Sequence, residues 1–339
     1  MIGAAAVQAS IDRPDGTGRP DVRAVVVSYL PDPAKFSRLL HSLVHQVKEI
    51  VIVDNTPAAD ERVAETIAGG IDASTPIRLI RLGDNLGIAA ALNVGVEAAI
   101  VAGAKYVLLS DQDSVPASSM VDELLRVVRE RQAAGDRVGC VGPTYVDEVS
   151  GQTFGFQVQE PGRLFYSVRD GDRADPWVEV ITGITSGSLI PSEVFAEVGV
   201  MREDYFIDYV DTEWCHRARA AGFRLFGTSR ARMVHHLGDD SFPVWYGRWR
   251  PFSAYSPLRL YYRFRNFILL MKCTYVPWKW KVRASWYWLG NLYAYALFSP
   301  RRLQNIRFIA RGLADGVLGR GGRIDRARGS TLDSARTPS

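Results

Sequence analysis

Between residues 23 and 110 the chain alternates short apolar, largely β-branched runs with longer stretches whose apolar residues recur at helical spacing. The short runs have the length of buried strands, and the longer stretches have the length of helices. Strands that alternate with helices in this way form a mostly parallel sheet. We therefore expect an α/β domain with a central sheet flanked by helices. The expected strands are 23–28, 49–53, 77–81 and 106–110, and the expected helices begin near residues 33, 58 and 86.

Carboxylate and amide side chains follow three of these strands, as Asp54-Asn55, Asp84-Asn85 and Asp111 with Asp113. The carboxyl ends of parallel strands line one crevice, which is the usual ligand site of an open α/β sheet. Alternate residues of an extended segment point the same way. Asp111 and Asp113 could therefore share one hard divalent cation that rests on a diphosphate. Helix capping would explain each pair alone, but the three together favour a binding site.

Several common signals are missing from the sequence. No GxGxxG follows the first strand and no P-loop motif occurs, so neither a dinucleotide-binding fold nor a P-loop is indicated. Cys140, Cys215 and Cys273 lack metal-binding spacing, and we expect buried small residues in a reducing compartment. No run of 18 uninterrupted apolar residues predicts a membrane-spanning helix.

A second group of carboxylates lies further along the chain. A helix is expected from about Asp208 to Gly222, with Gly222 as its C-terminal cap. Asp208, Asp211 and Glu213 would then occupy its first two turns. Acidic residues suit the positive end of a helix dipole, but that effect explains one carboxylate better than three. Upstream, short strands are expected at 138–141, 153–158 and 178–182, followed by a turn rich in glycine and hydroxyl groups at 183–191.

Several segments together resemble glycosyltransferase family 2, of the inverting GT-A type, in order and spacing over about residues 22–240. The matching segments are 25–29, 51–55, 84–87 with Asn93, 111–113 and 206–217. Segments 185–190, 206–214, 235–239 and 259–266 resemble the L-rhamnosyltransferase branch of that family. The resemblance implies the GT-A nucleotide-diphospho-sugar transferase fold with a C-terminal helical extension.

The resemblance also implies a role for individual residues. Asp111 and Asp113 match the family's DxD motif, and Asp211 matches its catalytic base. The residue before the base is Val210 instead of the family's Glu, which leaves open whether Asp208 supplies the missing charge. Ser28, Tyr29 and Asp54 are implied at the nucleotide base and ribose, and Asn85, Gly87 and Asn93 near the nucleotide. His235 is implied as a metal ligand, with His236 as the competing choice. The implied acceptor or supporting residues are Asp208, Glu213, Trp214, Ser186, Gly187 and Arg217.

The implied reaction moves L-rhamnose from dTDP-L-rhamnose to a saccharide acceptor, expected to be lipid-linked, in cell-surface polysaccharide synthesis. A carboxylate base would take the acceptor's proton, and Mg²⁺ or Mn²⁺ would stabilise the departing diphosphate. The runner-up is a family 2 enzyme that uses another donor, such as UDP-galactofuranose or a UDP-hexose. A non-catalytic module that binds a sugar or a nucleotide is a further alternative, but the retained carboxylates favour turnover.

The last hundred residues differ in charge from the rest. After residue 240 there are 18 basic and three acidic residues, and six of the eight tryptophans. Trp, Tyr and cations at the rim of a helix near 277–300 suit an anionic bilayer surface, so we expect a peripheral protein on the cytoplasmic face of the membrane. A helical lid packed on the catalytic domain is the alternative. Basic residues with exposed aromatics also suit single-stranded nucleic acid, but the acidic crevice would repel its phosphates and no nucleic-acid partner is expected.

This division predicts four segments. Residues 1–20 form a disordered lead-in, 21–240 the catalytic domain, 241–320 a helical basic and aromatic extension, and 321–339 a disordered tail.

Overall fold

The computed structural model describes residues 21–58, 60–71, 74–148, 151, 153–160, 162–163, 165–169, 177–235 and 241–324. The lead-in at 1–20 lies outside them. In chain order the elements are β1 (Val22–Ser28), α1 (Pro33–Leu43), β2 (Glu49–Asp54), α2 (Arg62–Ala68), β3 (Ile77–Arg81), α3 (Ile88–Val101), β4 (Tyr106–Asp111), β5 (Val115–Pro116), α4 (Met120–Ala133), β6 (Val138–Asp147), β7 (Thr153–Phe154), β8 (Phe156–Val158), β9 (Ser167–Arg169), β10 (Val178–Val180), β11 (Leu189–Pro191), α5 (Ser192–Val198), the 3₁₀ turn η1 (Glu203–Tyr205), α6 (Val210–Ala220), β12 (Arg224–His235), β13 (Ser241–Trp245), β14 (Trp249–Ser253), α7 (Pro257–Lys272), α8 (Trp278–Leu297) and α9 (Arg302–Val317).

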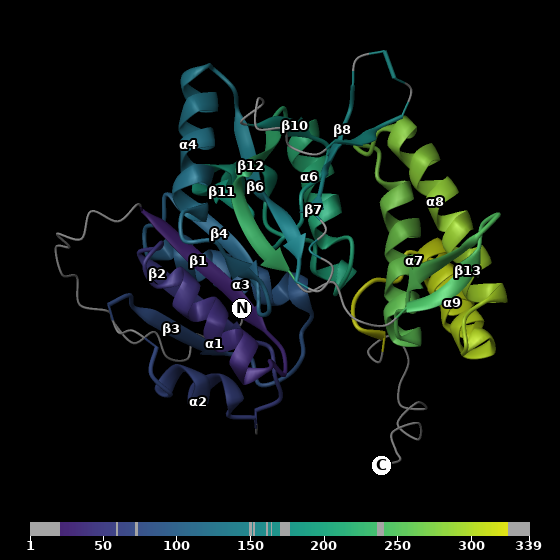
Figure 1. Cartoon of the computed structure of the whole chain (residues 1–339), viewed down its shortest axis with the longest axis horizontal. Helices are drawn as coiled ribbons and strands as arrows, with labels where there is room; N and C mark the ends of the chain where they lie inside the picture. Colours follow the sequence, from purple (N-terminus) through teal and green to yellow (C-terminus); the bar gives the residue numbers. More distant parts are fainter. Residues whose placement is uncertain are drawn as a thin grey trace.

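The central sheet has the strand order β10-β12-β6-β11-β4-β1-β2-β3, and helices cover both of its faces (Figure 1). Strand β1 pairs in parallel with both β2 and β4. Its side chains alternate between two hydrophobic cores: Val25 and Val27 face the core shared with α3 and α6, whereas Ala24 and Val26 face the core shared with α1 and α4. Burial on both faces explains why the sequence of β1 is an unbroken apolar run. The parallel pairing and the helices on both faces confirm the expected mostly parallel, helix-flanked sheet.

Strand β11 is an antiparallel insertion between β4 and β6. It brings the turn before it against the end of β4, where Gly187 N–H donates to the carbonyl of Leu109 at 2.8 Å. Gly187 has a φ of +80°, and a Cβ there would lie 2.5 Å from Pro143 Cγ. Only glycine fits this close approach in a left-handed conformation. The insertion thereby places the 183–188 turn beside the end of β4.

Helix α6 begins at Val210, two residues later than the sequence predicted. Phe206, Asp208 and Tyr209 all have left-handed φ values, of 62°, 62° and 66°. Asp208 therefore lies in a bent segment ahead of the helix and not in its first turn. Gly222 follows the helix with a φ of +87°, as expected for a C-terminal glycine.

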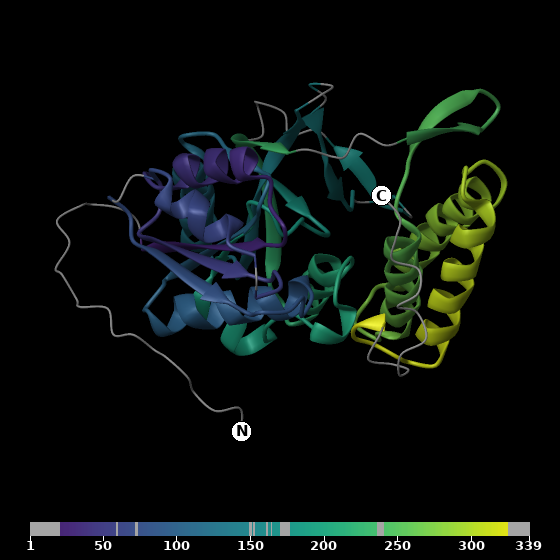
Figure 2. The same ribbon diagram turned by 90° about the horizontal axis from the view of Figure 1, so that it is seen from below.

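Helices α7, α8 and α9 lie side by side next to the sheet domain (Figures 1 and 2). They share a hydrophobic core of their own, which includes Leu260, Trp288 and Tyr295. Residues 321–324 were assigned to the disordered tail, but they pack against α7, where Ile324 N–H donates to Tyr262 Oη at 3.0 Å. Residues 325–339 lie outside the described part of the chain. Among the helices of the described residues, none has the length and apolarity to cross a membrane.

Candidate active site

The turn before β11 contacts both of the aspartates that the sequence assigned to donor and base. Asp111 is the last residue of β4, and its main-chain N–H donates to Ser186 Oγ at 3.2 Å. Asp211 is in the first turn of α6, where Oδ2 accepts a hydrogen bond from Thr185 N–H at 3.3 Å. Adjacent residues of one turn therefore hold Asp111 and Asp211. Ser186 is fully buried and also donates to Ser114 Oγ, which fixes the turn on the strand side.

The carboxylates influence one another electrostatically. Burial, together with the charges of Asp113 and Asp211, raises the pKa of Asp111 to about 7, while Arg259 opposes them. Burial also raises the pKa of Asp211, against the hydrogen bonds from Thr212 and Thr185, and Asp208 adds to the increase. A carboxylate with a raised pKa is a better proton acceptor near neutral pH than an ordinary aspartate. The arrangement therefore suits proton transfer at Asp211.

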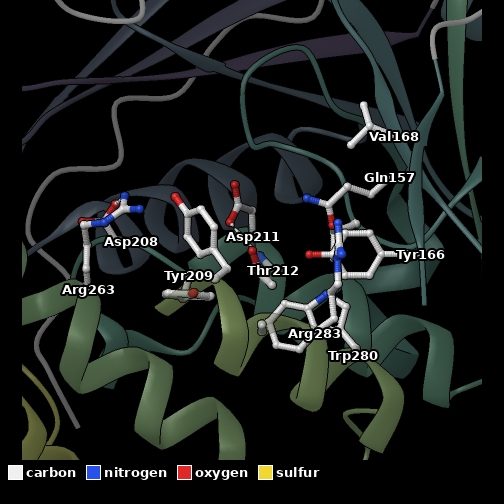
Figure 3. A pocket seen from close by; sticks show the side chains of 13 residues that line it. Gln157, Tyr166, Val168, Asp208, Tyr209, Asp211, Thr212, Arg263, Trp280 and Arg283 are labelled. Atoms are coloured by element: carbon white, nitrogen blue, oxygen red, sulfur yellow. Dashed lines mark hydrogen bonds and ion pairs between the residues drawn. The ribbon is translucent and has the colours of Figure 1, made fainter. Parts of the chain in front are cut away.

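Asp211 opens into a cleft of about 490 Å³ between the sheet domain and helices α7 and α8 (Figure 3). In Figure 3, Asp208, Arg263 and Tyr209 lie on one side of Asp211. The labelled side chains of Gln157, Tyr166, Trp280 and Arg283 lie on its other side. The lining residues are Gln157, Tyr166, Val168, Thr182, Asp208, Tyr209, Asp211, Thr212, Arg263, Trp280, Arg283, Ala284 and Tyr287. A substrate hydroxyl has room to approach Asp211 from this cleft.

The residues expected around the nucleotide lie at the ends of β1 and β2. Asp54 is buried, and its Oδ1 accepts hydrogen bonds from Ser28 Oγ at 3.5 Å and from Thr56 N–H at 3.2 Å. The main-chain N–H of Tyr29 donates to Gln112 Oε1 at 2.7 Å, while the Tyr29 ring is exposed. Gln112 is the central residue of the Asp111–Asp113 motif, so this bond joins the end of β1 to the acidic pair.

The loop after β3 is tied to the end of β2 and to the segment before α6. Asn85 Oδ1 accepts hydrogen bonds from Asn55 Nδ2 at 3.1 Å and from Gly87 N–H at 3.0 Å. Gly87 has a φ of +93°, and a Cβ there would lie 2.5 Å from Phe206 Cδ2. The next residue, Ile88, donates its N–H to the carbonyl of Phe206 at 2.7 Å. Gly87 therefore couples the β3–α3 loop to the segment that carries Asp208.

Asn93 was grouped with the nucleotide-binding residues, but the structure places it in the interior of the fold. Its Nδ2 donates to the carbonyl of Met201 at 2.9 Å and to Glu203 Oε1 at 3.0 Å, and its Oδ1 accepts from Met201 N–H. Both ends of the amide are used within the chain. These contacts connect α3 to the segment after α5. The Asn93 side chain therefore stabilises the interior of the fold, and its hydrogen bonds do not direct it toward a nucleotide.

Three candidate acceptor or supporting residues of α6 face the interior. Glu213 is fully buried and accepts two hydrogen bonds from Arg217, at 2.9 and 3.0 Å, and one from Tyr275. Trp214 donates its indole N–H to the carbonyl of Gly199 at 2.9 Å. These contacts anchor α6 to the end of α5 and to the loop between α7 and α8. Glu213, Trp214 and Arg217 therefore support the helix that carries Asp211 and do not line the cleft.

Asp208 is neutralised by two arginines of α7. Arg259 Nε and Nη2 both lie 3.2 Å from its carboxylate oxygens, and Arg263 Nη1 lies 3.3 Å away. An aspartate held in this way is poorly suited to act as a second proton acceptor beside Asp211. The structure therefore favours a positioning role for Asp208, and it adds Arg259 and Arg263 to the site.

Asn266 of α7 secures the backbone of the same segment. Its Nδ2 is within 2.7–2.8 Å of the carbonyls of Tyr205, Ile207 and Asp208, and the residue is fully buried. Its neighbour Arg265 donates to the carbonyls of Asp204 and Tyr205 at 3.1 and 2.9 Å. The sequence singled out 259–266 as a likeness to the rhamnosyltransferase branch without giving these residues a role. Three arginines within seven residues, followed directly by an asparagine, were the available sequence signal.

The chemistry of the site suits a hard divalent cation at Asp111 and Asp113. Two carboxylates on alternate residues offer oxygen ligands, and the mutual charge that raises the pKa of Asp111 would be relieved by a cation. The side chain of His235 and all of His236 lie outside the described residues. Within the part that the structure describes, no three His, Cys, Asp or Glu side chains are grouped closely enough to hold a metal by themselves. Any further ligands would come from a bound diphosphate or from His235 or His236.

Residues 24–185 match the family model described as glycosyl transferase family 2. The dTDP-rhamnosyl transferase RfbF of Shigella flexneri is 32% identical over 257 residues, which make up 76% of this chain and 82% of that protein. The chain belongs to glycosyltransferase family 2. The galactofuranosyltransferase GlfT1 of Mycobacterium tuberculosis (strain ATCC 25618 / H37Rv) is 27% identical to this glycosyltransferase over 261 residues, 72% of the chain and 80% of that protein.

Two solved structures share the fold of this glycosyltransferase. GalNAc-T7, solved with UDP, GalNAc and Mn²⁺, has a TM-score of 0.57 at 12% identity, with 89% of this chain and 56% of that chain covered. The mannosyltransferase PcManGT from Pyrobaculum calidifontis, in complex with GDP-Man and Mn²⁺, has a TM-score of 0.53 at 15% identity, with 91% and 90% covered. The chain thus spans just over half the length of GalNAc-T7. The expected GT-A fold is confirmed.

Proposed function

We propose that this glycosyltransferase moves L-rhamnose from dTDP-L-rhamnose, with inversion, to a saccharide acceptor of cell-surface polysaccharide synthesis. The observation that carries the proposal is the 32% identity to a dTDP-rhamnosyl transferase over 82% of that protein's length. The main chain of Asp111 and the carboxylate of Asp211 both bind adjacent residues of the 183–188 turn. This supports the proposal independently, because the donor and the acceptor must meet between these two aspartates.

Asp211 is the residue we assign to the base. Its carboxylate takes the proton of the acceptor hydroxyl as the oxygen attacks the anomeric carbon, and the bond to the nucleoside diphosphate breaks on the opposite side. Thr185 and Thr212 orient the carboxylate through hydrogen bonds to different oxygens. Ser28, Tyr29, Asp54, Asn85 and Gly87 form the nucleotide end of the proposed donor site.

Asp111 and Asp113 are the residues we assign to a divalent cation, Mg²⁺ or Mn²⁺. A cation there supplies charge stabilisation to the departing diphosphate. His235 is the proposed third protein ligand, with His236 as the competing choice. The Mn²⁺ in the two structural neighbours supports this assignment.

A panel of nucleotide-sugars tests the donor. Nucleoside diphosphate release with and without saccharide acceptors should be fastest with dTDP-L-rhamnose, and UDP should not be released from UDP-galactofuranose or UDP-hexoses at a comparable rate. The similarity to GlfT1 makes UDP-galactofuranose the second candidate donor. Faster turnover of UDP-galactofuranose would replace the rhamnosyl assignment and leave the family intact.

We also propose that the extension docks on an anionic membrane surface, where a lipid-linked acceptor would be presented. Six side chains on α8 recur at spacings of three or four residues and so form one helical stripe. All are apolar or aromatic and 36–69% exposed: Trp278, Val282, Trp286, Leu289, Tyr293 and Leu297. Lys279, Lys281, Arg283, Arg301 and Arg302 surround the ends of the helix. An apolar stripe with flanking cations is suited to an anionic bilayer interface.

Co-sedimentation with phosphatidylglycerol-containing vesicles at physiological salt tests the docking. Trp278→Glu with Trp286→Glu should abolish binding, because both rings would otherwise enter the interface. The matched control is Val101→Glu with Val200→Glu, which adds the same two charges at exposed apolar positions outside the extension. Equal binding of both double variants would contradict the proposal.

A further inference from the structure

One wall of the cleft, on the other side of Asp211 from Asp208 and Arg263, carries chemistry that proton transfer does not use. Helix α8 contributes Trp280, Arg283 and Tyr287 to this wall, and the β8–β9 hairpin contributes Gln157 and Tyr166. Figure 3 shows Arg283, Tyr166 and Trp280 grouped together, away from Asp208 and Arg263. Three aromatic rings and a guanidinium in one wall are suited to a sugar that carries a negative charge, since sugar rings pack against aromatic faces and guanidinium binds oxyanions.

The two arginines of the cleft differ in their pairing. Arg263 is only 14% exposed and is ion-paired to Asp208 at 3.3 Å. Arg283 is exposed and lies over the ring of Tyr166 at 5.3 Å, and no carboxylate of the described residues pairs with it. Helix α8 contains no acidic residue at all. The positive charge at this end of the cleft is therefore available to a ligand.

Trp280 adds a buried indole to the same wall. Its indole Nε1 is buried and has no acceptor among the described residues. Buried polar groups are usually paired, so the unpaired indole N–H is an exception in this part of the wall. Arg283 is therefore an exposed donor of the α8 wall, whereas Asp211 is an acceptor.

We propose that the α8 wall is the acceptor subsite and that Arg283 binds a phosphate group of the acceptor saccharide, whose ring lies on Tyr166, Trp280 and Tyr287 with a hydroxyl directed to Asp211. This inference rests on the proposed function and names its acceptor class. Successive helical residues are about 100° apart, so Val282 and Trp286 of the exposed stripe lie next to Arg283 on the helix surface. A phosphate that joins a saccharide to a lipid would be located where the cleft meets this exposed stripe.

Binding of soluble probes tests the subsite without any donor present. Calorimetric titrations compare glucose 1-phosphate, methyl glucoside, glucuronate and inorganic phosphate on the full chain. A charge-assisted hydrogen bond contributes about tenfold or more in affinity. Glucose 1-phosphate should therefore bind at least about tenfold more tightly than methyl glucoside. It should also bind more tightly than inorganic phosphate, because only the sugar phosphate contacts the rings. Stronger binding of glucuronate would assign the subsite to an acidic sugar instead of a phosphate and overturn the proposal.

The matched variants are Arg283→Gln and Lys279→Gln, on the same helix but with only Arg283 in the cleft lining. Arg283→Gln should abolish the preference for glucose 1-phosphate over methyl glucoside, and Lys279→Gln should keep it. An unchanged preference in Arg283→Gln would overturn the proposal. So would displacement of glucose 1-phosphate by dTDP, since the donor phosphate would then occupy the wall. Because these titrations contain no donor, failure of rhamnosyl transfer in the donor panel is a separate result.

Discussion

The side-chain amide of Asn266 in α7 donates to the carbonyl of Asp208 at 2.8 Å, two residues before the helix that carries Asp211. The same nitrogen also reaches the carbonyls of Tyr205 and Ile207. The C-terminal extension therefore holds the left-handed backbone of the catalytic domain in place. This contact makes the extension part of the site and not only a lid beside it.

Asn266→Ala removes the donor to all three carbonyls. Leaving buried acceptors unpaired should cost roughly 2–4 kcal/mol in the free energy of unfolding. The kcat should fall as well, because the backbone before Asp211 loses its support. The control is Asn291→Ala, a buried asparagine of α8 that donates to a single carbonyl of its own helix. Denaturant unfolding and steady-state kinetics measure both variants. Equal destabilisation of the two would count against the support role.

Gly87→Ala tests the close approach to Phe206. A Cβ at this position would lie 2.5 Å from the Phe206 ring and 2.7 Å from its carbonyl oxygen, in a backbone with a φ of +93°. We expect a loss of roughly 1–3 kcal/mol in the free energy of unfolding and a raised KM for the donor. Gly70→Ala is the control, because Gly70 also has a positive φ but nothing lies within 4 Å of its added Cβ. A raised KM in Gly70→Ala alone would contradict the account.

The raised pKa of Asp111, about 7, predicts proton release when a divalent cation and dTDP bind. At pH 6 the carboxyl is largely protonated, so a ligand that requires the carboxylate must displace the proton, whereas at pH 8.5 there is little to displace. Calorimetry in buffers of different ionisation enthalpy measures the protons released. Asp111→Asn should release fewer protons at pH 6.

Removal of the divalent cation should stop the reaction. Excess EDTA should remove turnover in transfer assays, and full activity in EDTA would exclude an essential ion.

His216 predicts a loss of stability in mild acid. Burial lowers its pKa to about 3, and its ring packs edge-on against Trp280 with no hydrogen-bond partner for either nitrogen among the described residues. The folded protein keeps this histidine neutral, while the unfolded chain takes up a proton below about pH 6.5. Its contribution is therefore complete above pH 6.5 and is lost as the pH falls toward 3.

His216→Phe should remove this part of the pH dependence. Between pH 7.5 and 5.0 the variant should lose roughly 2 kcal/mol less in the free energy of unfolding than the unaltered protein. Urea titrations at the two pH values measure the difference. Parallel losses in both proteins would show that other groups control the acid sensitivity.

The sheet could be predicted from the sequence because strands buried on both faces leave a plain apolar run. Strand β3 spans Ile77–Arg81, the range predicted for it. Strand β11 has only three residues, and its position between β4 and β6 depends on long-range pairing that no local pattern records. The sequence pattern predicts helix at Asp208, but the backbone there is held by hydrogen bonds from Asn266, more than fifty residues away. The cleft was missed for the same reason, since its lining comes from separate parts of the chain.

The central claim is that Asp211 accepts the proton of the acceptor hydroxyl in rhamnosyl transfer. The most direct measurement is the kcat of Asp211→Asn with saturating dTDP-L-rhamnose and acceptor, together with the Kd of dTDP. Loss of a general base commonly costs about 10²–10⁴-fold in rate. We predict a fall in kcat of that size with an almost unchanged Kd for dTDP. A kcat close to that of the unaltered enzyme would contradict the assignment of Asp211 and the reading of the cleft built on it.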